Sequence, residues 1–180
     1  MSSSAVSFGQ LLRRFRDNRT GASAVEFAIV APLFLALLFA IIETALMFFA
    51  SQVLETITQD AARMILTGQA QTANYQQADF KTYVCNQIPA IFSCANVIVN
   101  VQSSSSVSGV APSNPFDASC NLQSSQVQYS PGGPGDTVLV QVFYKWQLFV
   151  AGLGYSFANC PNNQYKLSAT AAFQNEPYSN

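Results

Sequence analysis

The pattern of hydrophobic and polar positions divides the chain into a helical first part and a β-rich remainder. From Phe27 to Ile42 every residue is apolar, and after Glu43 the apolar character resumes through Ala50. The 24 residues from Phe27 to Ala50 would form a helix about 36 Å long, which exceeds the roughly 30 Å hydrocarbon core of a bilayer. The pattern therefore predicts a transmembrane helix over about 27–50.

A cleaved secretory signal is the alternative interpretation of this segment. Its apolar stretch is longer than the apolar region of a signal peptide, and its basic flank is too long. The nearest small-residue site, Phe48-Phe49-Ala50, places bulky side chains where a signal peptidase needs small ones. These features favour a retained anchor.

The helical pattern continues beyond the membrane as an amphipathic stripe. Apolar residues recur at three- and four-residue spacing, with polar residues between them: Val53, Leu54, Ile57, Ala61, Met64 and Ile65. Gly68 provides a C-terminal stop. We therefore expect one long helix over 22–67, in lipid along its first half and packed on a small domain along its second half.

The remaining residues, 68–180, predict an extracytoplasmic α+β head. Pro131–Gly135 is a dense turn signal, Ser103–Ser108 reads as a low-complexity linker, and Asp79–Ile88 can form a short helix. Alternating apolar positions predict three strands, which are Asn96–Gln102, Thr137–Trp146 and Tyr165–Gln174. The expected fold is the long N-terminal helix packed on a small antiparallel sheet.

The placement of charge predicts the orientation of the anchor. Only 9% of residues are charged, against about 25% in a soluble domain. Half of the basic residues precede the apolar run, as Arg13, Arg14, Arg16 and Arg19. Because basic flanks stay in the cytoplasm, we expect residues 1–21 to lie inside and the head to lie outside. The net charge of -1 predicts no nucleic-acid partner, since phosphate binding requires clustered Lys and Arg.

All four cysteines lie on the exported side, as Cys85, Cys94, Cys120 and Cys160. An even number in that compartment indicates disulfides, for which three connectivities are possible. We favour Cys85–Cys94 as a local bridge and Cys120–Cys160 as a longer one. Four free thiols are the alternative.

The composition disfavours catalysis and predicts no catalytic residue, metal or cofactor. The chain has no histidine, which removes the usual general base and zinc ligand. Asp117, Asp136 and Glu176 are scattered along the sequence rather than paired. An exported hydrolase remains a third class of function, and we expect a protein that is not an enzyme.

The most informative motif lies where the chain enters the apolar run, with the sequence Arg19-Thr20-Gly21-Ala22-Ser23-Ala24-Val25-Glu26-Phe27. A glycine follows the basic residues, and a glutamate lies five residues after it. This motif, with Pro32, Glu43 and Ala61-Ala62-Arg63 further along, resembles the TadE-like family, whose members accompany the bacterial Tad (Flp) pilus machinery. The tail Phe173–Pro177 resembles related proteins more weakly.

The resemblance implies a minor pseudopilin-like protein with a pilin-like head. In processed members of such families, a prepilin peptidase cuts after the glycine. Carried over to this chain, Gly21 would end the leader and Ala22 would be the mature N-terminus. Glu26 would then be the fifth mature residue. Some members are not processed, so a permanently anchored periplasmic binding domain is the alternative function.

Three residues are candidates for subunit packing, namely Glu26, Phe27 and Glu43. The Glu26 carboxylate could pair with the new amino group of Ala22 on a neighbouring subunit, or it could be an interfacial glutamate stabilised by the helix dipole. Glu43 lies about 24 Å beyond Phe27 along a helix axis. It could reach the headgroups at the outer membrane edge or contact another subunit.

The expected partners are the bacterial inner membrane, other pilin-like subunits, the Tad assembly platform and the prepilin peptidase. The chain would be a single-pass protein with a cytoplasmic N-terminus and a periplasmic head, and it could enter the pilus. A place at the base of the pilus, at its tip or as a linker is equally compatible with the sequence.

Overall fold

The computed structural model describes residues 21–150 and 157–178. Its internal contacts divide the chain into two units, Met1–Ile42 and Glu43–Asn180. The predicted basic leader lies outside the described residues, except for Gly21. Helix α2 (Ala22–Leu66) begins in the first unit and continues into the second.

Helix α2 confirms the long helix predicted over 22–67, and its C-terminal end explains the glycine that follows. Gly68 has a φ of 74°, in the left-handed region that glycine adopts without a steric penalty. Its N–H donates a hydrogen bond to the carbonyl of Ile65 at 3.0 Å. A Cβ at this position would lie 2.5 Å from the ring of Tyr178. Both the backbone angle and the close approach of Tyr178 therefore require glycine here.

The second unit contains an antiparallel sheet with the order β1-β2-β3. Its strands confirm the three predicted ones, with the bounds β1 (Val97–Ser104), β2 (Thr137–Gln147) and β3 (Gln164–Gln174). The first strand is longer than predicted, because Ser103 and Ser104 pair with Val138 and Thr137. These two serines therefore belong to the sheet rather than to a linker.

Short helical elements connect the long helix to the sheet. Helix α3 (Gln69–Thr72) follows Gly68 directly, and α4 (Gln77–Gln87) confirms the second helix that was predicted. A capping box begins α4, in which the side chains of Gln76 and Asp79 each accept a backbone N–H of the other residue, so that two otherwise unpaired donors are satisfied. Single 3₁₀ turns are η2 (Cys94–Asn96), η3 (Val107–Gly109) and η4 (Ser124–Gln126).

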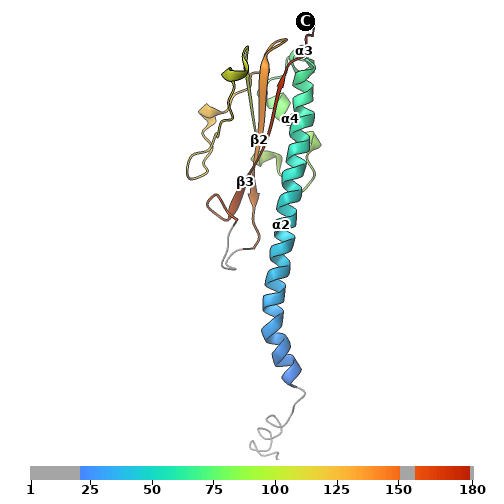
Figure 1. Cartoon of the computed structure of the whole chain (residues 1–180), viewed down its shortest axis with the longest axis vertical. Helices are drawn as coiled ribbons and strands as arrows, with labels where there is room; N and C mark the ends of the chain where they lie inside the picture. Colours follow the sequence, from blue (N-terminus) through green and yellow to red (C-terminus); the bar gives the residue numbers. More distant parts are fainter. Residues whose placement is uncertain (1–20, 151–156, 179–180) are drawn as a thin grey trace, which may run out of the picture. The chain divides into compact units, whose positions relative to one another are not determined.

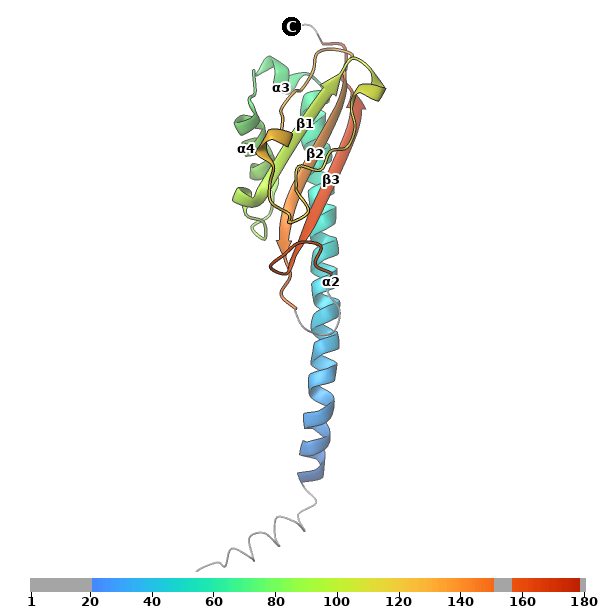
Figure 2. The same ribbon diagram turned by 90° about the vertical axis from the view of Figure 1, so that its left-hand side faces the viewer.

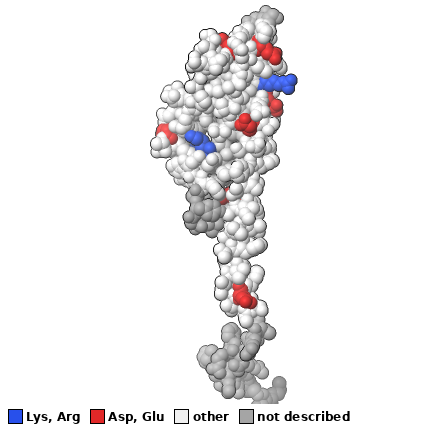
Figure 3. All heavy atoms as spheres, viewed as in Figure 1, with Lys and Arg blue, Asp and Glu red and all other residues white. Residues whose placement is uncertain are grey.

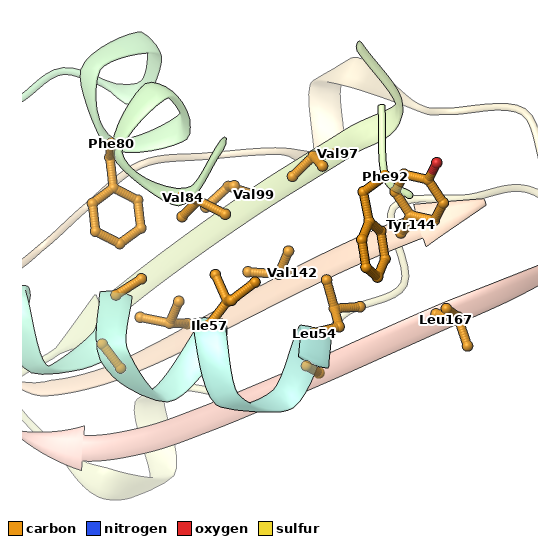
Figure 4. Close-up of a cluster of buried hydrophobic side chains, with 14 of the residues drawn as sticks. Leu54, Ile57, Phe80, Val84, Phe92, Val97, Val99, Val142, Tyr144 and Leu167 are labelled. Carbon is orange, nitrogen blue, oxygen red and sulfur yellow. The ribbon is translucent and has the colours of Figure 1, made fainter. Parts of the chain in front are cut away.

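The core of the second unit lies between the sheet and two helices. Helices α2 and α4 cover the same face of the sheet (Figures 1 and 2). Figure 4 shows their buried side chains meeting those of the strands: Leu54, Ile57, Phe80 and Val84 face Val97, Val99, Val142 and Leu167. The stripe predicted on the second half of α2 therefore forms one wall of the core.

The opposite face of the sheet is covered by the connection between β1 and β2. Ser113 in this connection accepts a hydrogen bond from the Asn100 amide at 2.9 Å, and its backbone N–H donates to Gln141. Phe116 packs edge-on against Phe143, with 5.8 Å between the ring centres. Because both faces are covered, β2 is buried along nearly its whole length.

The C-terminal tail ties the end of α2 to the turn before β2. The amide of Asn175 donates hydrogen bonds to the carbonyls of Pro131 and Gly133 at 2.9 and 3.0 Å. The N–H of Glu176 donates to the carbonyl of Leu66 at 2.9 Å, which satisfies one of the open acceptors at the helix end. The Phe173–Pro177 sequence thus has a structural role within this chain.

Two disulfides, Cys85–Cys94 and Cys120–Cys160, join the four cysteines in the pairing that the sequence favoured. The first bridge ties the end of α4 to η2, nine residues further along. The second bridge spans 40 residues and ties the β1–β2 connection to the segment before β3. Both bridges lie in a small unit, where cross-links add stability that a modest core lacks.

We predict that the two bridges differ in their contribution to stability. Restriction of the unfolded chain stabilises by about 3.9 kcal/mol for a 40-residue loop and by about 2.6 kcal/mol for a nine-residue loop. Cys120→Ser/Cys160→Ser should therefore lower the free energy of unfolding by about 1.3 kcal/mol more than Cys85→Ser/Cys94→Ser. Denaturant titration of the full chain in micelles, followed by Trp146 fluorescence, measures this difference. Equal losses would contradict the loop-length argument.

Candidate functional site

The N-terminal end of α2 holds the predicted processing site. Ala22 is the first residue of the helix, and Gly21 immediately precedes it. Both residues are exposed, and a Cβ on Gly21 would meet no atom within 4 Å. The Gly21–Ala22 bond therefore lies at an uncrowded helix boundary, where a protease can reach the backbone after local unwinding.

Glu26 lies one turn further along the same helix and is exposed. The first turn of α2 contains no acidic residue, so Glu26 lies beyond the turn in which a carboxylate gains most from the helix dipole. Residues four apart lie on the same helix face, so Glu26 and Ala22 point to the same side. This geometry weakens the dipole interpretation of Glu26.

The apolar stretch after Glu26 exposes its side chains on every side of the helix. Phe27 is 73% exposed and Leu33 is 76% exposed, and none of the residues from Ala22 to Ile42 is buried. Residues 27–42 contain no charged side chain, and the exposed helix in Figure 3 is almost free of acidic and basic groups. A helix that is apolar all round needs lipid or other helices around it. By length and composition α2 can cross a membrane.

Pro32 lies inside this apolar stretch without ending the helix. Proline removes one backbone hydrogen-bond donor, which leaves the carbonyl one turn earlier without its usual partner. Transmembrane helices tolerate such a residue when neighbouring groups satisfy the freed carbonyl.

Glu43 occupies a position that the sequence did not predict. Its side chain is only 6% exposed, and Oε1 accepts hydrogen bonds from the backbone N–H groups of Phe149 and Val150, the latter at 3.0 Å. These residues follow β2, more than a hundred positions away in the sequence. The Glu43 carboxylate is therefore bound within its own chain rather than extended toward the headgroups. Its predicted contact with another subunit stays a prediction.

This contact stabilises the chain where β2 ends. Two adjacent N–H groups beyond the last strand pair would otherwise have no acceptor from the sheet, and a carboxylate is a strong acceptor for them. Leu148 beside them is buried, at 3% exposure. Glu43 thus fixes the start of the β2–β3 connection against α2.

Burial raises the pKa of Tyr178 in the C-terminal tail. Two further ionisable groups of the head, Asp117 and Tyr129, also have shifted pKa values. Hydrogen bonds from the backbone and side chain of Asn121 lower the pKa of Asp117. The Asp117 carboxylate closes a local turn by accepting hydrogen bonds from the backbone N–H groups of Ser119 and Asn121. Burial, together with the charge of Asp79, raises the pKa of Tyr129 to about 12. Neither group has a pKa near neutrality, which general acid–base catalysis favours. Among the described residues, no cluster of three Cys, Asp or Glu side chains could hold a metal ion.

A groove beside the first residues of β1 is one candidate for binding a ligand in the head. It has a volume of about 350 Å³ and is lined by residues of α4, β1 and the β1–β2 connection, among them Lys81, Val97, Val99, Leu122 and Val127. Its size is at the lower end of the range for small-molecule sites.

We predict that the Glu43 contact contributes measurably to stability. Glu43→Ala leaves two N–H groups without an acceptor, which should lower the free energy of unfolding by roughly 1–3 kcal/mol. Glu43→Gln keeps an acceptor oxygen and should lose less. Hydrogen exchange at the amides of Phe149 and Val150 should accelerate in the alanine variant and remain slow in the glutamine variant.

The control is Asp60→Ala, which removes an exposed carboxylate from the same helix. Such a surface change should alter the free energy of unfolding by less than about 0.5 kcal/mol. An equal effect of Glu43→Ala and Asp60→Ala would show that the Glu43 hydrogen bonds do not stabilise the fold.

Comparison with known proteins finds one family model that matches part of this chain. The family model described as TadE-like protein matches residues 21–63, which confirms the resemblance seen in the sequence. The match includes Gly21, Ala22, Glu26, Phe27 and Glu43, and it ends before the head begins at residue 68. No curated protein and no solved structure matches the chain.

Proposed function

We propose that this chain, with its TadE-like segment, is a membrane-anchored, minor pseudopilin-like component of a Tad (Flp) pilus assembly system. It acts by helix–helix packing rather than by catalysis. The observation that carries the proposal is the first half of α2. From Ala22 to Ile42 its apolar side chains are exposed on all sides, and the acidic residue of this stretch, Glu26, lies four residues after Ala22.

The proposed orientation has the N-terminus in the cytoplasm and the head in the periplasm. Four arginines precede the helix, and no basic residue follows until Arg63, as the positive-inside rule requires. Both disulfides lie after the apolar segment, and disulfides persist in oxidising compartments such as the periplasm.

In the proposed assembly step, Glu26 selects the register between neighbouring helices. A carboxylate in a helix bundle within the membrane is costly unless it is paired. Cleavage after Gly21 would create an amino group on Ala22, and that group on a neighbouring subunit would pair with Glu26. Phe27 beside it would pack in the same contact. The cleavage would be carried out by the prepilin peptidase.

An unprocessed anchor that carries a periplasmic binding domain is the second candidate. The groove beside β1 favours it, since Lys81 and the apolar lining could hold a ligand. The two candidates differ in the N-terminus of the mature protein.

We expect the membrane-extracted protein to begin at Ala22 in cells that contain the prepilin peptidase, and to keep its leader in cells that lack it. Mass spectrometry of the intact protein measures this. Gly21→Val should block cleavage because a β-branched side chain disfavours the tight approach that glycine allows. Gly9→Val, in the same leader, is the control. An intact leader in the presence of the peptidase would instead support the permanently anchored binding domain.

We expect Glu26→Ala and Glu26→Gln to insert into the membrane normally and to fail in assembly. Removing one partner of a buried ion pair costs about 3–5 kcal/mol, which corresponds to more than a hundredfold loss in the assembly equilibrium. Surface pili should be counted in cells in which each variant replaces the native protein. Asp60→Ala is the control and should assemble normally. A native number of surface pili with both Glu26 variants would contradict the proposed pairing of Glu26 with Ala22.

A further inference from the structure

We infer that the end of the head around Phe149 lies in the interfacial layer of the lipid bilayer and forms a second, shallow membrane contact beside α2. The inference rests on the proposed membrane anchorage of the chain. The partner is the boundary between lipid headgroups and acyl chains.

Phe149 has the most exposed aromatic side chain among the described residues of the head, at 74% exposure. It follows Leu148, which is buried in the core, so the chain turns from the protein interior to the surface between these two residues. A single exposed apolar residue is common on soluble proteins. The location of Phe149 in the structure is what distinguishes it from such a residue.

Glu43 fixes this location at the end of the apolar segment. The Phe149 N–H is hydrogen-bonded to the Glu43 carboxylate, and Glu43 follows Ile42 directly in the chain. Phe149 therefore lies where the helix leaves the apolar stretch that extends from Phe27 to Ile42. The same contact satisfies two backbone N–H groups, as a layer with little water requires.

The helix at this level remains apolar on the side that the head leaves open. Between Thr44 and Ala50 there is no charged residue. Met47 and Ala50 are buried against the head, whereas Phe48 and Phe49 are 63% and 54% exposed. Phe48 and Phe49, five and six residues beyond Glu43, thus continue the apolar surface about 8 to 9 Å further along the helix axis.

The length of the apolar segment gives the depth of this surface. The stretch from Ala22 to Ile42, in which no residue is buried, would extend about 32 Å as a helix, close to the roughly 30 Å of the hydrocarbon core. Glu43 follows this stretch directly, so Glu43 and the Phe149 N–H bonded to it fall in the interface. Aromatic side chains are favoured in this layer, and the head already packs on the helix there.

A second contact constrains how the protein sits in the membrane. An isolated helix can rotate about its axis, but a helix with the Phe149 side chain held in the interface on one side has a preferred rotation. Phe149 would thus determine which face of α2 is directed toward neighbouring subunits.

The test uses the full chain in phosphatidylcholine vesicles that carry bromine near the headgroup end of the acyl chains. Bromine quenches tryptophan at the same depth. The native chain has one tryptophan, the buried Trp146, and provides the baseline that is subtracted. Phe149→Trp is the reporter. Val107→Trp is the matched control, because Val107 is 78% exposed. It follows β1 at the end of the sheet where β2 begins, whereas Phe149 follows the last residue of β2 at the other end. The 11-residue β2 separates the two ends by about 35 Å.

The tryptophan at position 149 should lose at least about half of its emission in brominated vesicles, with a shift to shorter wavelength, as expected for an interfacial side chain. The tryptophan at position 107 should be unaffected. Equal emission of both reporters, with the chain still resistant to extraction by urea, would overturn the membrane contact of Phe149 and leave the anchor intact. Release of the chain by urea would overturn both the anchor and this contact.

Discussion

The two halves of α2 have different surroundings, and the rest of the structure depends on this constraint. Along its first half α2 is apolar on all sides, whereas along its second half it buries a single stripe against the sheet. Leu54 and Ile65 provide the volume of that stripe, and Ala50 and Ala61, both fully buried, let the helix approach the strands closely. Because no other helix of the described second unit exceeds the 11 residues of α4, the head has no core without α2. The core of the second unit therefore depends on the part of α2 that follows Glu43.

Glu43 lies on α2 between the part that is apolar on all sides and the part that packs on the sheet. An unpaired carboxylate at that depth would be costly, and the two N–H groups beyond β2 would be equally costly without an acceptor. Joining them removes both penalties with one contact. The change from an all-round apolar helix to a one-sided stripe therefore begins at a defined residue, and the head cannot slide along α2 without breaking these bonds.

The sequence predicted those parts of the fold that depend on local periodicity. The 3.6-residue stripe on α2, the alternation in the three strands and the glycine at position 68 are properties of neighbouring residues. The extension of β1 into Ser103 and Ser104 was missed, because serines carry no hydrophobic pattern and gain their place by pairing with β2. The contact of Glu43 with Phe149 was missed for a stronger reason: it joins backbone groups to a side chain more than a hundred residues away, and backbone groups leave no mark in the sequence.

The two ends of α2 therefore have separate roles. The core of the head uses residues from Glu43 onward, while Gly21, Ala22 and Glu26 make no contact that the fold needs. Cleavage after Gly21 would remove four arginines and create one amino group on a helix that is already folded and anchored. The protein could then change its charge at the cytoplasmic face without any change in its core. A subunit built in this way can complete its folding and disulfide formation before it becomes competent to assemble, because the groups that stabilise it and the groups that would pair it with a neighbour are not shared.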